Sequence, residues 1–188
     1  MRKIIVLNRI TLDGMFDGPN GEQDWFIPGD AENKASHEMV PPTDMLLFGR
    51  KSYENMIRFW PTVTEDSDFP EAVKAQAKEI NEMPKVVFSR TLKNLTWQNS
   101  KLMTGDLIPE VKKLKQTDGL GILTLGSGSI IQQLTDAGLI DEFVFILTPT
   151  VLVNGKPQFK QDKKVDFELV ESRSFKTGNV MLHYTVKR

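Results

Sequence analysis

The stretch Leu123-Thr124-Leu125-Gly126-Ser127-Gly128-Ser129-Ile130-Ile131 changes pattern halfway along. Its apolar beginning, from residue 121, predicts a strand, whereas Ile130, Ile131 and Leu134 recur with the spacing of a helix. Small residues between a strand and a helix let backbone N–H groups approach a phosphate, and the helix dipole favours negative charge there. The alternative is a glycine turn with a serine N-cap that serves only the geometry of the chain.

Outward from this stretch, most of the chain repeats the same alternation. Strand-like runs occupy residues 3–7, 45–48 and 85–89, and helical spacing occurs at 53–60, 69–80 and 107–114. Strands that alternate with helices need crossover connections, so an α/β fold with a mostly parallel sheet and helices on both faces is expected. The last third contains three strand-like runs, 142–148, 167–173 and 179–187, with a turn at 176–179. These runs predict an antiparallel edge, and the lack of repeats or linkers predicts a single domain over 1–188.

Composition excludes several classes of function. The 188 residues include 24 Lys and Arg against 25 Asp and Glu, so no overall positive field attracts nucleic acid. Cys is absent and only two His are present, which excludes disulfides and thiolate zinc sites and predicts no metal site. The apolar runs are too short for a signal or membrane segment, so a cytoplasmic protein that does not enter membranes is expected. His37, His183 and the basic stretch 112–115 are expected at the surface.

Two other strand ends also carry polar groups. Gly49-Arg50-Lys51-Ser52 begins a helix with two cations, which oppose the helix dipole unless an anion binds there. The alternative is that these cations are solvated surface charges. Ser89-Arg90-Thr91 places a hydroxyl and a guanidinium after the next strand, where open α/β sheets bind ligands. Together with Gly126-Ser127-Gly128-Ser129, these segments predict one site for an anionic ligand.

These three segments resemble, in order and spacing, the cofactor motifs of the dihydrofolate reductase superfamily. Thr11-Leu12-Asp13-Gly14 and Gly155-Lys156-Pro157 make the chain most similar to the reductase domain of the bifunctional riboflavin-biosynthesis deaminase-reductase. The resemblance covers nearly the whole chain and implies a dihydrofolate reductase-like fold that binds NADPH. It places Arg50 and Ser89-Arg90 near the 2′-phosphate and the Gly126 loop at the pyrophosphate. The implied cofactor-binding residues are Gly49, Arg50, Lys51, Ser52, Ser89, Arg90, Thr91, Gly126, Ser127, Gly128, Ser129 and Ile130.

The substrate side is also assigned by resemblance. Trp25-Phe26-Ile27-Pro28-Gly29-Asp30 is similar to the segment that ends in the substrate-facing acid of dihydrofolate reductase, which implies a catalytic role for Asp30 and a substrate contact for Trp25. The alternative is that Asp30 is the N-cap of the following helix. The glycine-containing loop 13–21 is long enough for a lid, with Met15 and Phe16 as its apolar contacts to the substrate.

The expected function is an NADPH-dependent reductase that transfers hydride to a small heterocycle or carbonyl compound. The resemblance implies a pterin, or a riboflavin-pathway pyrimidine such as 5-amino-6-(5-phosphoribosylamino)uracil, and pairing with a second copy as a homodimer. One alternative is an NADPH-binding sensor module without turnover, which would need the same phosphate-facing motifs but no acid. A structural or interaction protein is the third possibility.

Overall fold

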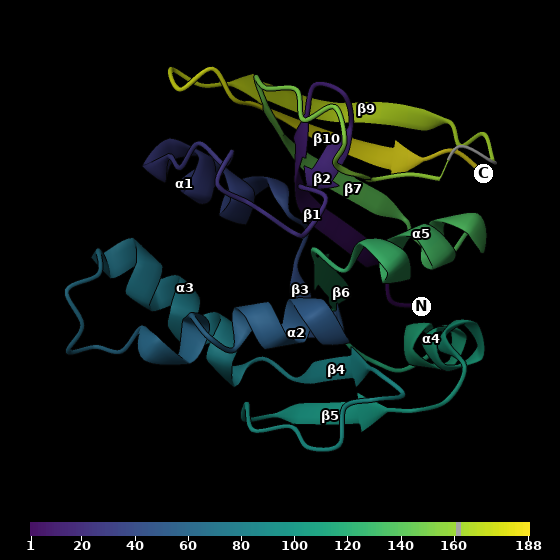
Figure 1. Ribbon diagram of the computed structural model, residues 1–188. Coiled ribbons are helices and arrows are strands. Elements are labelled where there is room, and N and C mark those ends of the chain that lie inside the picture. The colour runs from purple at the N-terminus through teal and green to yellow at the C-terminus, as the bar shows by residue number, and fades with distance from the viewer. Residues whose placement is uncertain (161–162) are drawn as a thin grey trace.

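The computed structural model describes residues 1–160 and 163–188. They form an eight-stranded sheet whose strands lie side by side in the following order (Figure 1). The strands are β5 (Ser100–Met103), β4 (Lys85–Phe88), β3 (Thr43–Gly49), β6 (Gly121–Leu125), β1 (Ile4–Thr11), β7 (Glu142–Thr148), β10 (Val180–Val186) and β9 (Phe167–Ser174). The strands from β5 to β7 are parallel, and β10 and β9 are antiparallel to their neighbours. The predicted mostly parallel sheet with an antiparallel edge is confirmed.

Helices cover both faces of the sheet (Figure 1). One face carries α1 (Asp30–Met39), α2 (Arg50–Met56) and α3 (Glu71–Glu82), and the other carries α4 (Leu107–Lys115) and α5 (Gly128–Asp136). Each helix buries one apolar stripe, such as Ile130, Ile131 and Leu134 of α5, against the sheet. None of the helices in the described residues is long and apolar enough to span a membrane.

Two local predictions need correction, and one strand was not predicted. The stripe over residues 53–60 is not one helix, because α2 ends at Met56 and a 3₁₀ turn, η1 (Trp60–Thr62), follows. Pro61 lacks the backbone N–H that would donate to the Ile57 carbonyl, so an α-helix cannot continue regularly through this residue. The predicted loop 13–21 contains a strand, β2 (Met15–Asp17), which pairs with β8 (Lys156–Pro157). The pattern also gave no prediction for β5, a short strand at one edge of the sheet.

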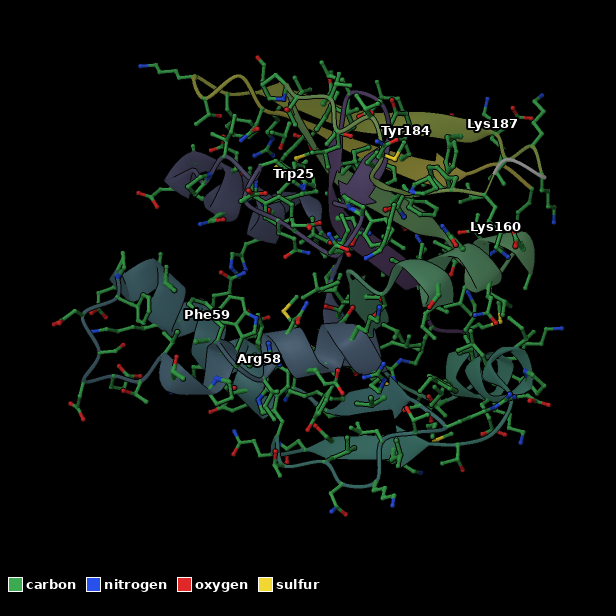
Figure 2. All side chains as sticks on the ribbon, viewed as in Figure 1. Trp25, Arg58, Phe59, Lys160, Tyr184 and Lys187 are labelled. Atoms are coloured by element: carbon green, nitrogen blue, oxygen red, sulfur yellow. The ribbon has the colours of Figure 1, made fainter. Side chains whose placement is uncertain are left out.

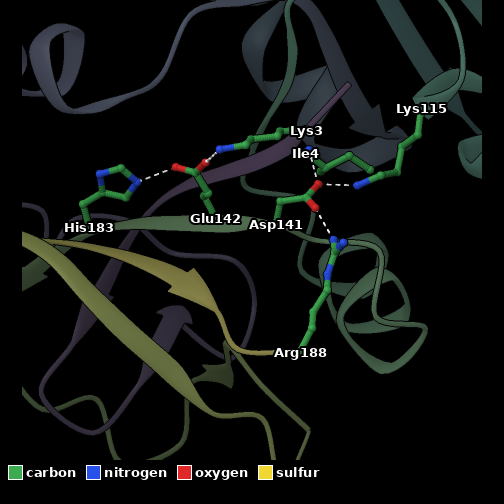
Figure 3. A network of polar contacts seen from close by, with 7 residues as sticks. All are labelled: Lys3, Ile4, Lys115, Asp141, Glu142, His183 and Arg188. Carbon is green, nitrogen blue, oxygen red and sulfur yellow. Dashed lines mark hydrogen bonds and ion pairs between the residues drawn. The ribbon is translucent and has the colours of Figure 1, made fainter. Parts of the chain in front are cut away.

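The prediction that His183 lies at the surface is wrong. Its side chain is buried, and Nε2 lies 2.6 Å from Oε2 of Glu142, whose other oxygen accepts a hydrogen bond from Lys3 at 2.7 Å (Figure 3). The alternating pattern of β10 predicted one solvent-facing side. Instead, Met181 on the same side as His183 packs in the core beneath α1, so both sides of β10 are covered.

The prediction for the basic stretch 112–115 fails at its last residue. Lys115 is buried, and its Nζ donates to the Leu139 carbonyl at 2.9 Å and to the Asp141 carboxylate (Figure 3). Asp141 also pairs with Arg188 and accepts a hydrogen bond from the Ile4 backbone N–H. We call this group the amino-end network, because β1 and β7 begin here. Its residues are Lys3, Ile4, Lys115, Asp141, Glu142, His183 and Arg188.

Candidate functional site

The three predicted segments meet at the carboxyl ends of the parallel strands, opposite the amino-end network. Because β4, β3 and β6 are neighbouring parallel strands, their carboxyl ends lie together. The backbone N–H of Gly49 donates to Oγ of Ser127 at 2.8 Å, which ties the end of β3 to the start of α5. A Cβ atom on Gly126 would lie 3.1 Å from Oγ of Ser52. The Gly49 and Gly126 segments are therefore in direct contact.

The third segment reaches the same place through a cavity of about 390 Å³. The cavity lies between the ends of β4 and β5 and the first turns of α4 and α5, and Ser89, Arg90, Asp106 and Ile130 are among its lining residues. The Ser89 hydroxyl accepts hydrogen bonds from the backbone N–H groups of Thr91 and Leu92, so Ser89 also holds the turn after β4. All three predicted segments thus surround the beginning of α5.

The glycine loop, residues 126–129, has an unusual backbone. Gly126 and Ser127 have φ values of 65° and 63°, in the left-handed region that favours glycine. Ser127 is the N-cap residue of α5, but in the described structure its hydroxyl makes no capping bond and instead accepts from Gly49. The simple N-cap alternative is therefore wrong for the serine hydroxyl. Gly128 and Ser129 begin the helix, where N–H groups lack acceptors within the helix.

The missing side chain of Gly128 makes room for Phe16. A Cβ atom on Gly128 would lie 2.0 Å from Cζ of the Phe16 ring, which is buried. Phe16, predicted to contact substrate from the lid, thus packs on the start of α5. Met15 is half-buried against Gly155, where an added Cβ would lie 2.8 Å from the Met15 Cβ. The segment predicted to be a lid is therefore packed against the glycine loop and β8.

The predicted cations are exposed. Arg50 pairs with Glu54 at 3.0 Å, and Arg90 pairs with Asp106 at 2.9 Å, where both side chains are more than three-quarters exposed. Lys51 is also exposed. Exposed ion pairs contribute little to stability, so a bound anion can compete for these guanidinium groups.

Asp30 is the first residue of α1, and its side chain is exposed. The N-cap residue is Gly29, so the alternative of Asp30 as an N-cap is wrong. Trp25 is half-buried in the segment before α1, with its ring edge-on to Phe26 at a centroid distance of 4.5 Å. Figure 2 shows Trp25 on the α1 side of the molecule and Phe59 on the α2 and α3 side.

A second carboxylate, Glu32, was missed by the sequence analysis. Its Oε1 accepts from Nδ2 of Asn179 at 2.9 Å and from the Thr177 hydroxyl, while its buried Oε2 has no partner among the described residues. Burial raises the pKa of Glu32, but hydrogen bonds from Thr177 and Asn179, with the charge of Arg9, outweigh this and lower the pKa overall. The available signal was its spacing, because Glu32 shares one helical face with Ala35, Ser36 and Met39, which are also buried.

A separate cleft of about 280 Å³ opens between α1 and α3. Its floor is apolar, formed on the sheet by Leu7, Leu46, Leu123 and Leu125. At its sides, His37 of α1 is exposed, as predicted, with Nδ1 3.9 Å from Oε2 of Glu79 on α3. No Lys or Arg of the described chain lines this cleft.

Comparisons with known proteins agree with this architecture. The RibD C-terminal domain family matches residues 2–181. The protein YyaP of Bacillus subtilis (strain 168) is 33% identical over 185 residues, which cover 97% of this chain and 94% of YyaP. A putative riboflavin biosynthesis protein from Shewanella sp. PV-4 is 25% identical, with a TM-score of 0.73 and 99% of each chain covered.

A more distant likeness concerns the fold alone. Dihydrofolate reductase from Enterococcus faecalis, in complex with NADP(H) and RAB-propyl, is 12% identical, with a TM-score of 0.63. The match covers 99% of this chain and 97% of that one. This protein therefore belongs to the RibD C-terminal domain family and has the dihydrofolate reductase-like fold.

Proposed function

We propose that this protein is an NADPH-dependent reductase that transfers hydride to a small heterocycle or carbonyl compound. The observation that carries the proposal is the meeting of three strand ends around the beginning of α5, with exposed cations beside it. Helix N-termini and arginines are favourable partners for phosphate groups. Membership of a reductase-domain family supports the same conclusion.

The residues at these strand ends fit the phosphate groups of NADPH. The first N–H groups of α5 lack acceptors within the helix. The left-handed backbone at Gly126 and Ser127 leads directly into these N–H groups, so the loop can approach a phosphate closely. Among the described residues, Arg50 and Arg90 pair with surface carboxylates and are exposed, so they are available to a 2′-phosphate. When bound, NADPH supplies the hydride, and the chain supplies its orientation.

The cleft between α1 and α3 fits the substrate. Its leucine floor suits a flat, apolar ring, and the lack of a lining Lys or Arg among the described residues disfavours a phosphorylated group inside it. We therefore favour an uncharged pterin-like or pyrimidine-like ring over 5-amino-6-(5-phosphoribosylamino)uracil.

For the proton donor we propose Asp30, which begins α1, the helix that forms one side of the cleft; Asp30 itself is not among the residues that line the cleft. Reduction of a C=N or C=O bond places negative charge on the heteroatom, and a positioned acid contributes on the order of 10² to 10⁴ in rate. Asp30 is exposed to solvent at the first residue of α1, whereas Glu32 is buried and already accepts two hydrogen bonds. Asp30→Asn should therefore lower the reduction rate and spare NADPH binding, and Glu32→Gln should mainly lower stability. Unchanged turnover in Asp30→Asn across pH would move the proton source to water.

Titration of the intact protein with NADPH and NADH, at matched ionic strength, tests the cofactor. Two guanidinium groups around a 2′-phosphate should favour NADPH by about tenfold or more. Equal dissociation constants would contradict the assignment of Arg50 and Arg90, and no binding of either dinucleotide would contradict the proposed function.

Absorbance at 340 nm with a panel of pterins, pyrimidines and carbonyl compounds then tests turnover. We expect loss of NADPH absorbance with at least one uncharged ring compound. Tight NADPH binding without oxidation by any compound in the panel would favour the second candidate function, a sensor module.

A further inference from the structure

Asn8 is a polar residue in the middle of the apolar strand β1, and it is only 5% exposed. Its Oδ1 accepts the backbone N–H of Gly126 at 2.7 Å, and its Nδ2 donates to Oε1 of Gln158 at 2.8 Å. The carbonyl oxygen and the NH₂ group of the Asn8 amide are therefore both hydrogen-bonded, each to a different residue. A leucine or valine at this position would pack equally well in the strand but would leave the Gly126 N–H without an acceptor.

Gln158 carries this connection onward to the segment 14–17, which follows β1. Its side chain is 1% exposed, and its backbone N–H donates to the Gly14 carbonyl at 2.9 Å. Its side-chain Nε2 has no partner among the described residues, so the bond from Asn8 is what orients the Gln158 side chain. A continuous path thus runs from Gly126 through Asn8 and Gln158 to Gly14.

The same two segments touch at a second point. The Phe16 ring occupies the space beside Gly128, as described above, and the Met15 backbone pairs with Pro157, the neighbour of Gln158. Movement of segment 14–17 therefore affects the glycine loop through both Asn8 and Gly128. Packed contacts of this kind have discrete arrangements, so they can link the ordering of two segments.

We propose that Asn8 and Gln158 are positioning residues that couple segment 14–17 to the glycine loop. The coupling orders the loop for cofactor binding, and cofactor binding in turn orders the segment, because linkage between two sites is reciprocal. This inference rests on the proposed NADPH-binding function. Neither residue is assigned contact with the cofactor or the substrate.

The test compares two glutamines that hold the same part of the chain. Gln158→Met removes the acceptor for Asn8, whereas Gln132→Met removes a 2.8 Å bond from α5 to the Pro157 carbonyl and leaves Asn8 and Gly126 untouched. For each variant we would measure the NADPH dissociation constant, urea unfolding, and amide hydrogen exchange at Gly126 and residues 15–17, with and without NADPH.

Gln158→Met should raise the NADPH dissociation constant about tenfold, which corresponds to one buried hydrogen bond. It should also speed exchange at both segments and remove the protection that NADPH gives residues 15–17. Gln132→Met should leave the dissociation constant within about twofold of the wild-type value, because an exposed hydrogen bond is easily replaced by water. If Gln158→Met does not fold, Asn8→Ser cuts the same path from the other end and is measured in the same way.

Lower stability with an unchanged dissociation constant and unchanged protection by NADPH would overturn the inference, because the pair would then be merely structural. Failure of the proposed function is a different result, namely no NADPH binding by the wild-type protein. The exchange measured without NADPH then decides whether the coupling exists. Unchanged exchange at Gly126 and residues 15–17 in Gln158→Met would overturn it.

Discussion

The two ends of the parallel strands differ in how their charged residues are paired. In the amino-end network, Lys115 and Glu142 are buried, and their charges are matched by residues of the same protein (Figure 3). At the carboxyl ends of these strands, Arg50 and Arg90 are exposed, and within residues 1–160 and 163–188 each pairs with a surface carboxylate. The charges at the amino ends are already neutralised by partners within the protein, whereas the cations at the carboxyl ends can bind an anionic ligand.

The difference follows from the direction of the strands. Parallel strands place all their carboxyl ends, with the helix N-termini that follow, on one side of the sheet, so that side gathers unpaired N–H groups. The amino ends instead receive helix C-termini and the chain ends, where lysines and carboxylates can pair. A buried charge must be paired or its pKa shifts toward the neutral form, whereas an exposed charge keeps its hydration until a ligand replaces it. Three predictions test this contrast, and a fourth concerns the edge strand β9.

The largest effect is expected at Asp141. Asp141→Asn should lower the free energy of unfolding by about 3–5 kcal/mol, because it leaves the buried Lys115 ammonium without its partner. Asp106→Asn, which breaks the exposed pair with Arg90, should cost less than about 1 kcal/mol. Urea unfolding at neutral pH measures both, and equal costs would contradict the contrast between the two ends of the strands.

Arg90→Ala should weaken cofactor binding and leave the stability nearly unchanged, the opposite of Asp141→Asn. We expect the NADPH dissociation constant to rise about tenfold or more, with a change in the free energy of unfolding below about 1 kcal/mol. The dissociation constant for NADH should stay the same, since it lacks the 2′-phosphate. Lys113→Ala, which removes another exposed cation and its pair with Glu110, is the control and should change neither dissociation constant.

Lys85 is a third test, because its burial should make the stability of the protein depend on pH. It begins β4 at the amino ends of the strands, where its Nζ donates to the carbonyls of Asn81 and Met83 at 2.9 and 2.8 Å. Burial lowers the pKa of Lys85 from 10.5 to about 8. Between pH 8 and 10.5 the unfolded chain therefore holds more protons at this residue, and its contribution to stability rises with pH.

The free energy of unfolding can change by at most about 1.4 kcal/mol per pH unit from one such group. Urea unfolding of the wild-type protein and Lys85→Met across this window measures it as the difference between the two slopes. Identical slopes would show that Lys85 does not titrate with a lowered pKa. Lys78→Met, at an exposed position on α3, is the control.

The smallest effect on stability is expected on the edge strand β9, where we propose that a second copy associates. Leu169 and Val170 are 51% and 54% exposed there, and an edge strand offers unpaired backbone groups to an identical strand. Leu169→Lys should halve the mass measured by light scattering, with a change in the free energy of unfolding within about 0.5 kcal/mol. Ser172→Lys, on the same strand, controls for added charge. A monomeric wild-type protein would refute this pairing.

Much of the fold was predictable because it depends on local patterns. The alternation of apolar runs with helical stripes predicted the mostly parallel sheet. Local patterns failed both where a nearby proline breaks a helix and where a distant segment pairs with the chain. Pro61 ends the stripe over residues 53–60, and β2 exists only because β8, far along the chain, pairs with it.

The candidate site divides in the same way. The sequence by itself determined which strand ends carry small residues and cations, because these residues follow each apolar run directly. Only the tertiary structure decided that Phe16 fills the space beside Gly128, that Ser127 bonds to Gly49, and that Glu32 is buried beside Asn179. These contacts join residues far apart in the chain. The spacing of Glu32 places it on the buried face of α1, but no local pattern identifies Thr177 and Asn179 as its partners. The burial and pairing of each polar group depend on what the rest of the chain packs against it, which is a property of the folded structure.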